Sequence, residues 1–346
     1  MPLQGPDRPS APEEPVAAVP GGMPPAARDL AGYRNRPPDP RWPDGARLAV
    51  SFVVNVEEGA ELSLGSGDGR NEGVYEAREE VVGAPDPCME SHFAYGSRAG
   101  MWRILDLLDA FDAKATFSAC GRAVAATPEL AAEPRARGHE VGAHGWRWER
   151  HAGMPEAVER AVVARAVEAI SAACGERPVG WHTRSAASAN TRRLLIEEGG
   201  FLYDSDAYDD ALPRLVPGAP GGRAHVVLPY AFDTNDMRFA PGGGFVQAED
   251  FGRYCIAAVD WLLREGRTAP KMLSMDCTSA SSAARRACAA WRWCWSTWRG
   301  RPACGWRGGA TSPGTGWRAP ARAGAEVASL ARGLLRFTVI RPSSAP

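Results

Sequence analysis

The sequence predicts an α/β fold, most simply a barrel of parallel strands with helices outside. Apolar, β-branched runs alternate with segments of helical apolar spacing over about 230 residues. Polar residues crowd directly after several of the apolar runs, as they do on the active-site face of a parallel barrel. A chain of 346 residues, 45% hydrophobic and 23% charged, can fill such a core, and this composition excludes a disordered or fibrous protein.

The chain begins with a segment that we expect to be extended. Residues 1–45 are rich in Pro, Gly and Ala and end in the turn-forming string DPRWPDG, so the barrel is expected to begin at residue 46. The first buried strand is expected over RLAVSFVVNV, residues 47–56, because this run is apolar and β-branched. A polar stretch, residues 62–90, separates it from the next element.

Helices and strands are then expected to alternate up to residue 275. The helices cover GMWRILDLLDAFD, residues from about 128 to 137 and from about 155 to 173, NTRRLLIEEGG and AEDFGRYCIAAVDWLLREG. The strands cover KATFSAC, HEVGAHGW with its loop, PVGWHT, FLYDSDA, HVVLPYAF and PKMLSM. No Gly-rich phosphate loop, CxxC pair or GxSxG elbow accompanies them, so the pattern does not indicate a nucleotide, dithiol or serine-hydrolase site.

Two adjacent carboxylates, Glu57 and Glu58, stand at the end of the first predicted strand. Neighbouring side chains point to opposite sides of an extended chain, but both can approach one cavity if the strand has just ended. Repulsion between the two charges would then raise the pKa of one carboxyl, which would act as a base. A solvated pair in a turn is the other interpretation, and the sequence leaves open which of the two would be the base.

A histidine, His144, follows a short β-type run in GHEVGAHGWRWERH, and His151 comes seven residues later. Imidazoles that share one zinc ion suit helical spacings of three or four, whereas seven residues correspond to about 10 Å of helix rise. The residue four positions after His144 is Trp148, so a local zinc site with two histidines is missing. We expect His139 and His92, which lie in no motif, to be structural.

Two further polar clusters follow apolar strands, at WHTRSAASANTRR and at AFDTNDMRF. Such groups are typical of the active-site face of a barrel. Turn and helix-capping roles are equally open, and Asn190 is a plausible N-cap. The side chains concerned are His182 and Arg184 in the first cluster, and Asp233, Asn235, Asp236 and Arg238 in the second.

Several longer strings together resemble the polysaccharide deacetylase (NodB-homology) family, and within it the allantoinase-like branch. Residues 55–59, NVEEG, fall on the family's first motif, and residues 144–148, HGWRW, fall on its HxxxH metal motif. The strings NVEEGAE, YGSRAGMWR, HGWRW, NTRRLLIEEGGFLYDSDAYDD and LPYAFDTNDMRF follow one another in the order of that branch, between about residue 28 and residue 275.

The resemblance implies a distorted (β/α) TIM-like barrel that hydrolyses a non-peptide carbon–nitrogen amide bond. It places Glu57 at the position of the general base, and Glu58 and His144 at the positions of two metal ligands, whereas Trp148 replaces the third. Two ligands without a third make a poor zinc site, so the resemblance implies a degenerate metal site and no cofactor. A weakly held divalent metal such as zinc is the alternative.

The catalytic residues implied by the resemblance are Glu57, Glu58 and His144. A carboxylate would activate water for attack on a ring amide such as that of allantoin. His144 or neighbouring N–H groups would stabilise the tetrahedral oxyanion. The candidates for holding a small substrate rich in hydrogen-bonding groups are Tyr95, Arg98, Trp148, His182, Arg184, Asp233 and Asp236.

Residues 276–346 differ in composition from the rest of the chain. They carry 11 Arg against Asp276 and Glu326, and they hold six of the 12 Trp. A basic arm that binds nucleic acid and a Trp-rich lid are two interpretations. The family's Gly-Leu-His motif, whose His is usually a general acid, is expected here, yet DCTSASSAARR follows PKMLSM and no His follows His225.

A change of reading frame near Met275 accounts for this segment. If each codon takes the third base of one residue and the first two bases of the next, the codons that bridge residues 275–278 encode Gly, Leu and then His or Tyr. The Arg-rich composition indicates a GC-rich gene, which selects His. We therefore interpret residues 276 to about 320 as a frameshift product, and we expect poor solubility and little activity because the barrel would lack its last strand–helix pairs.

Three functions stay open on the sequence: a metal-independent hydrolase of allantoinase type, an N-deacetylase of chitin or peptidoglycan-type polysaccharides, and an inactive barrel or product of a disrupted gene. The N-terminal residues do not resemble a secretory signal, and no run of 18 apolar residues occurs, so we expect a cytoplasmic protein without a membrane partner. We expect a small-molecule substrate and no nucleic-acid partner, and homo-oligomerisation is open.

Overall fold

The computed structural model describes residues 29–73, 79–239, 243–279, 283–299, 305–307 and 337–341. The chain divides into two units, Met1–Arg36 and Pro37–Pro346, and the helices and strands named below belong to the second. Residues 1–28 of the predicted leader lie outside the described residues. Trp42, near the predicted end of the leader, is buried in the second unit and donates from Nε1 to Lys271 O at 2.8 Å.

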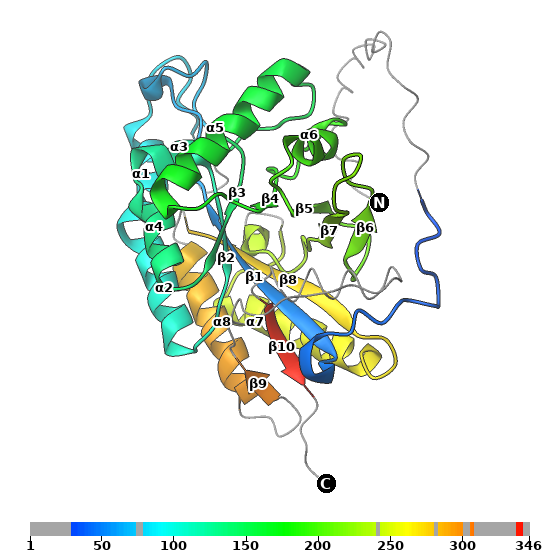
Figure 1. Ribbon diagram of the computed structural model, residues 1–346. Helices are drawn as coiled ribbons and strands as arrows, with labels where there is room; N and C mark the ends of the chain where they lie inside the picture. The colour runs from blue at the N-terminus through cyan, green and yellow to red at the C-terminus, as the bar shows by residue number, and fades with distance from the viewer. Residues whose placement is uncertain are drawn as a thin grey trace, which may run out of the picture. The chain divides into compact units, whose positions relative to one another are not determined.

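A curled sheet of mostly parallel strands forms the centre of the second unit (Figure 1). Its strands are β1 (Leu48–Val56), β2 (Thr116–Ala119), β3 (Glu140–Ala143), β4 (Gly180–Trp181), β5 (Tyr203–Ala207), β6 (Arg214–Val216), β7 (His225–Pro229), β8 (Lys271–Thr278), β9 (Gly305–Arg307) and β10 (Phe337–Arg341). β1 pairs in parallel with β2 and with β8. From β2 the parallel order continues through β3, β4 and β5 to β7, whereas β6 and β10 pair antiparallel with β7 and β1.

The two ends of the parallel series, β7 and β8, also meet. A parallel bridge joins Asn235 to Asp276, and the backbone N–H of Asp276 donates to Thr234 O at 3.0 Å. The hydroxyl of Ser274 on β8 accepts from Ala231 N, just after β7, at 2.8 Å. These contacts close the strands into a distorted TIM-like barrel, so the fold predicted from the sequence is confirmed.

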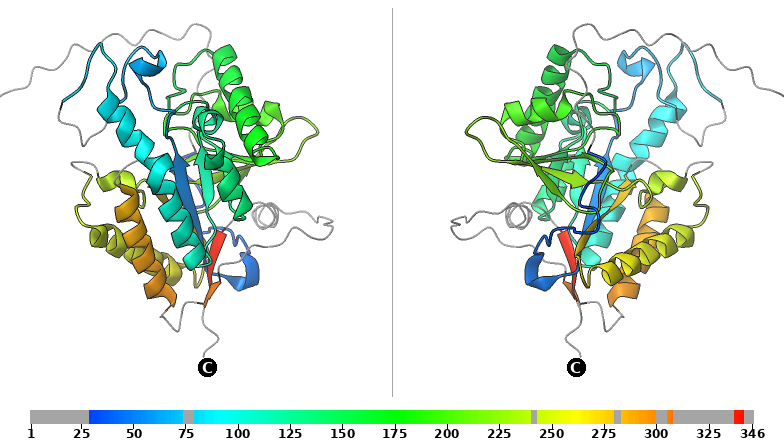
Figure 2. Two further views of the ribbon diagram at one scale, coloured as in Figure 1. Left: turned by 90° about the vertical axis from the view of Figure 1, so that its left-hand side faces the viewer. Right: turned by 90° about the vertical axis from the view of Figure 1, so that its right-hand side faces the viewer.

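Helices cover the outside of the barrel (Figures 1 and 2). They are α1 (Pro87–Tyr95), α2 (Met101–Ala110), α3 (Gly121–Ala126), α4 (Glu129–Ala136), α5 (Glu156–Cys174), α6 (Thr191–Glu198), α7 (Ala248–Glu265) and α8 (Ala283–Arg299). A π-helical segment, η3 (Gly96–Gly100), joins α1 to α2. α8 packs against both α2 and α7, and α7 and α8 contact β8. Among the described helices none is long and apolar enough to cross a membrane.

The strand β1 is buried on both faces, because one set of its side chains faces the barrel interior and the other faces the helices. Ser51 and Val53 line the interior of the barrel. Phe52 points toward the helices, with its ring centroid 5.2 Å from that of Trp291 and 5.0 Å from that of Trp295. Successive side chains of a strand alternate, so odd-numbered residues of β1 face the interior and even-numbered residues face the helices.

The residues that follow position 275 contribute to this folded unit. β8 extends to Thr278, so the boundary placed at residue 275 from the sequence lies inside a strand. α8 buries a stripe of residues at helical spacing, namely Ala284, Ala287, Cys288, Trp291, Cys294, Trp295 and Trp298. The origin of this segment in a frame change stays a prediction, and much of the region that the prediction covers, residues 308–336 included, lies outside the described residues.

Several short elements differ from the sequence prediction. α1 occupies the end of the stretch 62–90 and the residues after it, and the side chain of Asp86 caps it by accepting from Met89 N at 3.0 Å. α3, with the sequence GRAVAA, and β6 are too short for a periodic pattern. The formation of these elements therefore depends on local capping and packing, which a pattern of apolar residues does not encode.

The predicted N-cap position of Asn190 is confirmed, but the capping hydrogen bond of its side chain is not. Asn190 occupies the N-cap position of α6, but its side chain makes no capping hydrogen bond. Instead, the hydroxyl of Ser188 accepts from the backbone N–H of Asn190 at 2.9 Å and of Thr191 at 3.1 Å. The side-chain oxygen of Asn190 accepts from Arg193, because the guanidinium lies one turn further along the same helix.

Candidate active site

The carboxyl ends of β1 and β3, the two strands that flank β2 in the sheet, bring a carboxylate and an imidazole together. His144 directly follows β3, and its backbone N–H donates to Ala119 O at the end of β2 at 2.8 Å. Glu57 directly follows β1, and its Oε1 lies 3.6 Å from His144 Nε2. Both side chains are almost fully buried. A charge on either group is therefore felt strongly by the other, because little water lies between them to screen it.

The alternation of β1 separates the two adjacent carboxylates. Glu57 continues the odd-numbered series and points toward the interior side of the barrel, where it meets His144. Glu58 continues the even-numbered series and lies against Gly96 in η3, where an added Cβ would overlap its carboxylate. The carboxylates therefore do not share one position, and the alternative of a solvated pair in a turn is wrong because both are buried.

A short hydrogen bond fixes the protonation of His144. Its Nδ1 lies 2.6 Å from the backbone oxygen of His182. A carbonyl oxygen only accepts, so Nδ1 carries the hydrogen and donates it. In the neutral ring Nε2 then bears the lone pair, and this atom faces Glu57. His144 can consequently take up a proton at Nε2 and pair with the carboxylate as an imidazolium.

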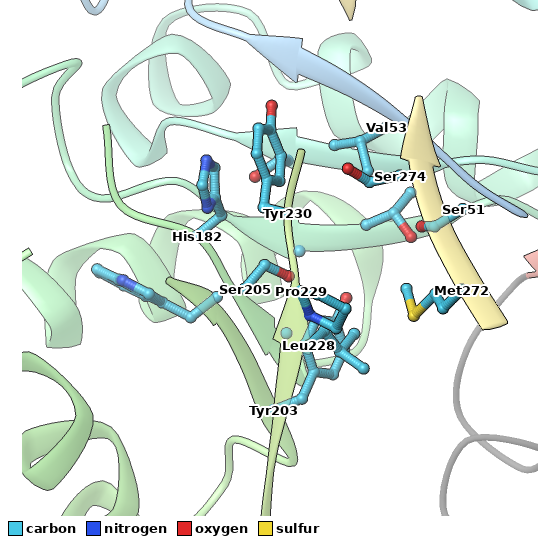
Figure 3. A pocket seen from close by; sticks show the side chains of 15 residues that line it. Ser51, Val53, His182, Tyr203, Ser205, Leu228, Pro229, Tyr230, Met272 and Ser274 are labelled. Carbon is cyan, nitrogen blue, oxygen red and sulfur yellow. The ribbon is translucent and has the colours of Figure 1, made fainter. Parts of the chain in front are cut away.

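Three aromatic rings are stacked beside this pair. The rings of His144 and His182 lie 5.2 Å apart at an angle of 8°, and those of His182 and Tyr230 lie 4.2 Å apart at 13°. Figure 3 shows His182 and Tyr230 side by side among the residues that line the barrel interior. The hydroxyl oxygen of Tyr230 accepts from the side-chain amides of Asn55 and Asn235 at 3.2 and 2.9 Å. The stack therefore links the carboxyl ends of β3, β4 and β7.

The barrel interior is lined by small polar groups, among them Ser51, Ser205 and Ser274, and by apolar side chains such as those of Val53, Leu228 and Met272 (Figure 3). Its cavity has a volume of about 20 Å³. A cavity of this size holds about one water molecule, so the interior does not accommodate an organic substrate. The substrate must approach from the loops at the carboxyl ends of the strands, which is the active-site face of a parallel barrel.

Glu58 is a buried acid with a strongly raised pKa. Burial raises the pKa of its carboxyl from 4.5 to about 8, and the negative charge of Glu57 adds to the shift. Its two oxygens have no hydrogen-bond partner within the described part of the chain. Glu58 is therefore mainly protonated and uncharged at neutral pH, because its ionised form would be poorly solvated.

A third acidic group, Asp236, lies near Glu57 at the end of β8. Its carboxylate accepts from Thr278 N at 3.1 Å, and the hydroxyl of Thr278 lies 3.4 Å away. Burial raises the pKa of Asp236 to about 7, and the negative charge of Glu57 contributes to the shift. The sequence prediction that Asp236 belongs to the site agrees with this position, whereas its role stays a prediction.

Arg184 and Trp148, which the sequence predicts to contact the substrate, form contacts with other residues of the chain and with each other. Two guanidinium nitrogens of Arg184 donate to the two carboxylate oxygens of Glu72, each at 3.1 Å. The guanidinium also lies 3.4 Å from the centre of the Trp148 ring and donates to Trp148 O at 2.9 Å. The backbone N–H of Trp148 donates to Ala60 O at 3.1 Å. We call Glu72, Arg184 and Trp148 the clamp.

Three other predicted substrate contacts have their described contacts elsewhere. The hydroxyl of Tyr95 accepts from Arg103 at 2.7 Å. Arg98 is exposed on η3. Asp233 is exposed and accepts from the hydroxyl of Tyr254 at 2.9 Å. The role of Tyr95, Arg98 and Asp233 in binding the substrate therefore stays a prediction.

Several residues of the site carry no signal in the sequence. Asn55 and Tyr230 lie inside the strings NVEEGAE and LPYAFDTNDMRF. Their place in the site follows from the register of the strands and from the hydrogen bond between them, neither of which the sequence shows. Glu72 lies in the polar stretch after β1, and its partner Arg184 is far away in sequence. Only the packing of the loops reveals that pair.

The residues present do not fit a zinc site. Glu57 and His144 offer two donors, and the position four residues after His144 is an indole, which has no lone pair for a metal. No group of three or more His, Cys, Asp or Glu among the described residues is placed to hold a metal ion. A structural or catalytic zinc ion takes at least three protein ligands, so we derive no step of the reaction through a metal.

The fold and the site together define a class of protein. A parallel barrel with a buried carboxylate–imidazole pair at the carboxyl ends of its strands has the architecture of a barrel hydrolase. The chain belongs to the polysaccharide deacetylase family. The model of that family matches residues 82–203, and a Schizosaccharomyces pombe protein assigned to the polysaccharide deacetylases is 37% identical over 271 residues, which are 72% of this chain and 83% of that protein.

Solved structures are similar to most of the chain. The crystal structure of PuuE allantoinase matches with a TM-score of 0.74 and 42% identity, over 79% of this chain and 91% of that one. A Pseudomonas aeruginosa PAO1 protein assigned to the polysaccharide deacetylases matches with a TM-score of 0.75 and 42% identity, over 79% and 92%. The family resemblance of the sequence motifs is thereby confirmed. The chain is a hydrolase of carbon–nitrogen bonds other than peptide bonds.

Proposed function

We propose that the protein opens a cyclic amide by metal-independent hydrolysis, with an allantoin-like ureide as its substrate. The observation that carries the proposal is the buried Glu57–His144 pair, in which a carboxylate and the lone pair of Nε2 face each other. The indole of Trp148 at the third ligand position supports a reaction without metal. The 42% identity to PuuE allantoinase supports the reaction class.

Glu57 is the base in this proposal. Its carboxylate takes a proton from water, and the oxygen of that water forms a bond to the carbonyl carbon of the ring amide. The carbonyl oxygen becomes the oxyanion of a tetrahedral intermediate. The carbon–nitrogen bond then breaks, the nitrogen leaves with a proton, and the product is an open-chain carboxylate with a free ureido group. The interior register of Glu57 favours it over Glu58, which is protonated at neutral pH.

His144 transfers the proton in this scheme. Its Nε2 accepts the proton that Glu57 has taken up, and the resulting imidazolium stabilises the oxyanion. The hydrogen bond from Nδ1 to His182 O keeps the ring in the orientation that this transfer needs. His182 and Asp236, which lie beside the pair, are the proposed contacts to the substrate.

Thr278 stands near the place where the frame-repaired sequence has a His. In this proposal that His is the acid that protonates the leaving nitrogen, as the family resemblance implies. Thr278 has a hydroxyl whose pKa is far too high for this role, so the chain with Thr278 is expected to be a slow catalyst. A His at this end of β8 would lie beside the carboxyl of Asp236, which now accepts from Thr278.

An N-deacetylase of a polysaccharide is the second candidate. The S. pombe relative and the P. aeruginosa structure, both assigned to the polysaccharide deacetylases, support it. The same carboxylate could direct water to an acetamide carbonyl. The lack of a third metal donor among the described residues favours the cyclic amide instead, because it leaves the acetamide without the usual activating ion.

One assay separates these functions. Ring opening of allantoin and acetate release from chitin oligomers are measured with the chain and with its frame-repaired form, each with and without a chelator. We expect ring opening that the chelator does not change, slow in the chain and faster after repair, and lost in Glu57→Gln. Acetate release that the chelator abolishes would contradict the proposal and favour the deacetylase. Inactivity of the repaired form toward both substrates would indicate an inactive barrel.

A further inference from the structure

The clamp joins three loops at the carboxyl ends of the strands. Glu72 follows β1, Trp148 follows β3 and Arg184 follows β4. The guanidinium of Arg184 is in contact with both other members, through two hydrogen bonds to Glu72 and through stacking on the indole of Trp148. The side chain of Glu72 is 5% exposed and that of Arg184 is 29% exposed, so the ion pair is largely shielded from water.

The clamp holds Trp148 against the turn that carries the candidate base. The backbone N–H of Trp148 donates to Ala60 O, three residues after Glu57, and its backbone oxygen accepts from Arg184. On the other side the ring of Trp148 lies 6.2 Å from that of Phe93 in α1. The indole is thus held from both sides, in the position where the metal motif of the family has its second His.

Three properties of the clamp oppose a divalent cation at this place. The indole of Trp148 offers a metal no lone pair. The guanidinium of Arg184 carries a positive charge, and it lies 3.4 Å from the centre of the indole ring. The carboxylate of Glu72 could serve as a metal ligand, but both of its oxygens accept from Arg184 at 3.1 Å.

We propose that Glu72 and Arg184 are positioning residues that keep the site free of metal, by holding Trp148 at the third ligand position and by placing a fixed positive charge on it. Replacement of Trp148 by His therefore does not suffice to create a zinc site while the guanidinium remains. The inference concerns the same site as the proposed function, but its test measures metal binding and needs no turnover.

The test is zinc affinity of the full-length chain, measured by isothermal titration calorimetry in Trp148→His variants. We expect W148H alone to bind zinc weakly. The variant W148H/E72Q/R184Q is expected to bind it about tenfold more tightly or better, because the guanidinium no longer opposes the ion. The two clamp substitutions remove one charge of each sign, so the net charge of the chain does not change.

Two further variants separate the effect of the Arg184 charge from the effects of the shape of its guanidinium and of its position in the chain. W148H/R184K keeps the positive charge but loses the planar group that stacks and binds both carboxylate oxygens, so its zinc affinity should stay near that of W148H. W148H/R193Q/E197Q removes a matched ion pair, 2.9 Å apart, from the surface of α6 and should not change the affinity either. Circular dichroism and thermal unfolding identify the folded variants, and W148H/R184Q replaces the triple variant if that one unfolds.

Equal zinc affinity of W148H and the clamp variants, whether tight or undetectable, would overturn the inference. A gain in W148H/R193Q/E197Q as large as in the clamp variant would also overturn it, because the effect would then not be local. A frame-repaired, metal-free chain that fails to open allantoin would refute the proposed function and leave this result unaffected. Conversely, an active chain whose clamp variants bind zinc no better would retain the function and lose the inference.

Discussion

At the scale of single residues, side chains alternate along β1, and the two adjacent glutamates that follow it therefore lie in different surroundings. Glu57 faces the imidazole of His144, whereas Glu58 is buried against Gly96. A carboxylate beside a proton-accepting ring is suited to act as a base, and a buried carboxyl with a pKa of about 8 is not charged at neutral pH. The sequence leaves the choice between them open, and the register of β1 favours Glu57.

The first prediction compares amide substitutions at these two residues in the frame-repaired chain. Glu57→Gln removes the base and should lower the rate of ring opening by about 10²- to 10⁴-fold. Glu58→Gln resembles the protonated carboxyl that is already present, so the rate should stay within about a factor of ten of the parent. Steady-state kinetics near neutral pH measure both. A larger loss for Glu58→Gln than for Glu57→Gln would reverse the assignment.

The second prediction concerns stability and pH. Burial raises the pKa of Glu58 from 4.5 to about 8, so between these values the folded chain keeps a proton that the unfolded chain has lost. Stability must then fall as the pH rises through this window, by at most about 5 kcal/mol for this one group, and level off above it. The amide in Glu58→Gln does not ionise, so the variant should gain stability over the parent between about pH 5 and pH 8.

Urea unfolding of the parent and of Glu58→Gln at both ends of that window measures the effect. The raised pKa of Asp236 adds its own fall in stability with pH, but it does so in both proteins and cancels in their difference. A difference between variant and parent that does not change with pH would show that Glu58 titrates normally in the folded chain.

At the scale of elements, long periodic segments could be predicted from the sequence, and short ones could not. The run 47–56 and the helical spacing of AEDFGRYCIAAVDWLLREG correspond closely to β1 and α7. α3 and β6 have too few residues for a period to emerge. The π-helical turn of η3 depends on how Gly96 packs against Glu58, which is a contact between distant parts of the chain.

The same limit applies to the candidate site. The motifs NVEEG and HGWRW predict a carboxylate and an imidazole at the ends of two strands, and the structure brings Glu57 and His144 together. The clamp could not be predicted, because the pairing of Glu72 with Arg184 joins two polar loops that have no pattern of their own. The motifs do not determine the direction of side chains such as those of Arg98 and Asp233, so the part of these residues in the site stays a prediction.

The third prediction tests the contact between η3 and β1. Gly96→Ala should destabilise the chain by about 1–3 kcal/mol, because the added methyl group overlaps the carboxylate of Glu58. Glu58→Ala in the same chain should recover part of that loss, since it removes the overlapping group. Gly69→Ala is the matched control, because an added Cβ at Gly69 meets no atom within 4 Å. Urea unfolding of the parent, Gly96→Ala, Glu58→Ala and the double variant gives the coupling, and additive losses would contradict the contact.

At the scale of the whole molecule, the segment after Met275 packs against the rest of the barrel, but one of its buried groups lowers the stability of the fold. α8 fits its buried stripe against α2 and α7, and β8 continues to Thr278 beside β1. Yet the indole Nε1 of Trp291 is fully buried with no hydrogen-bond partner in the described structure. A buried donor without a partner costs about 1–3 kcal/mol. A segment read in the wrong frame can retain apolar spacing and still carry such mismatched groups.

The last prediction is that restoring the reading frame improves both stability and catalysis. The repaired chain replaces the Trp-rich helix face by aliphatic residues and supplies a His near position 278, beside Asp236. We expect the midpoint of thermal unfolding to rise by roughly 2–10 °C and ring opening of allantoin to become faster. The DNA read across about codons 270 to 320 decides the frame itself. An uninterrupted frame with AT-rich third positions would refute the hypothesis, and equal turnover by the two chains would show that the segment after Met275 supplies no catalytic group.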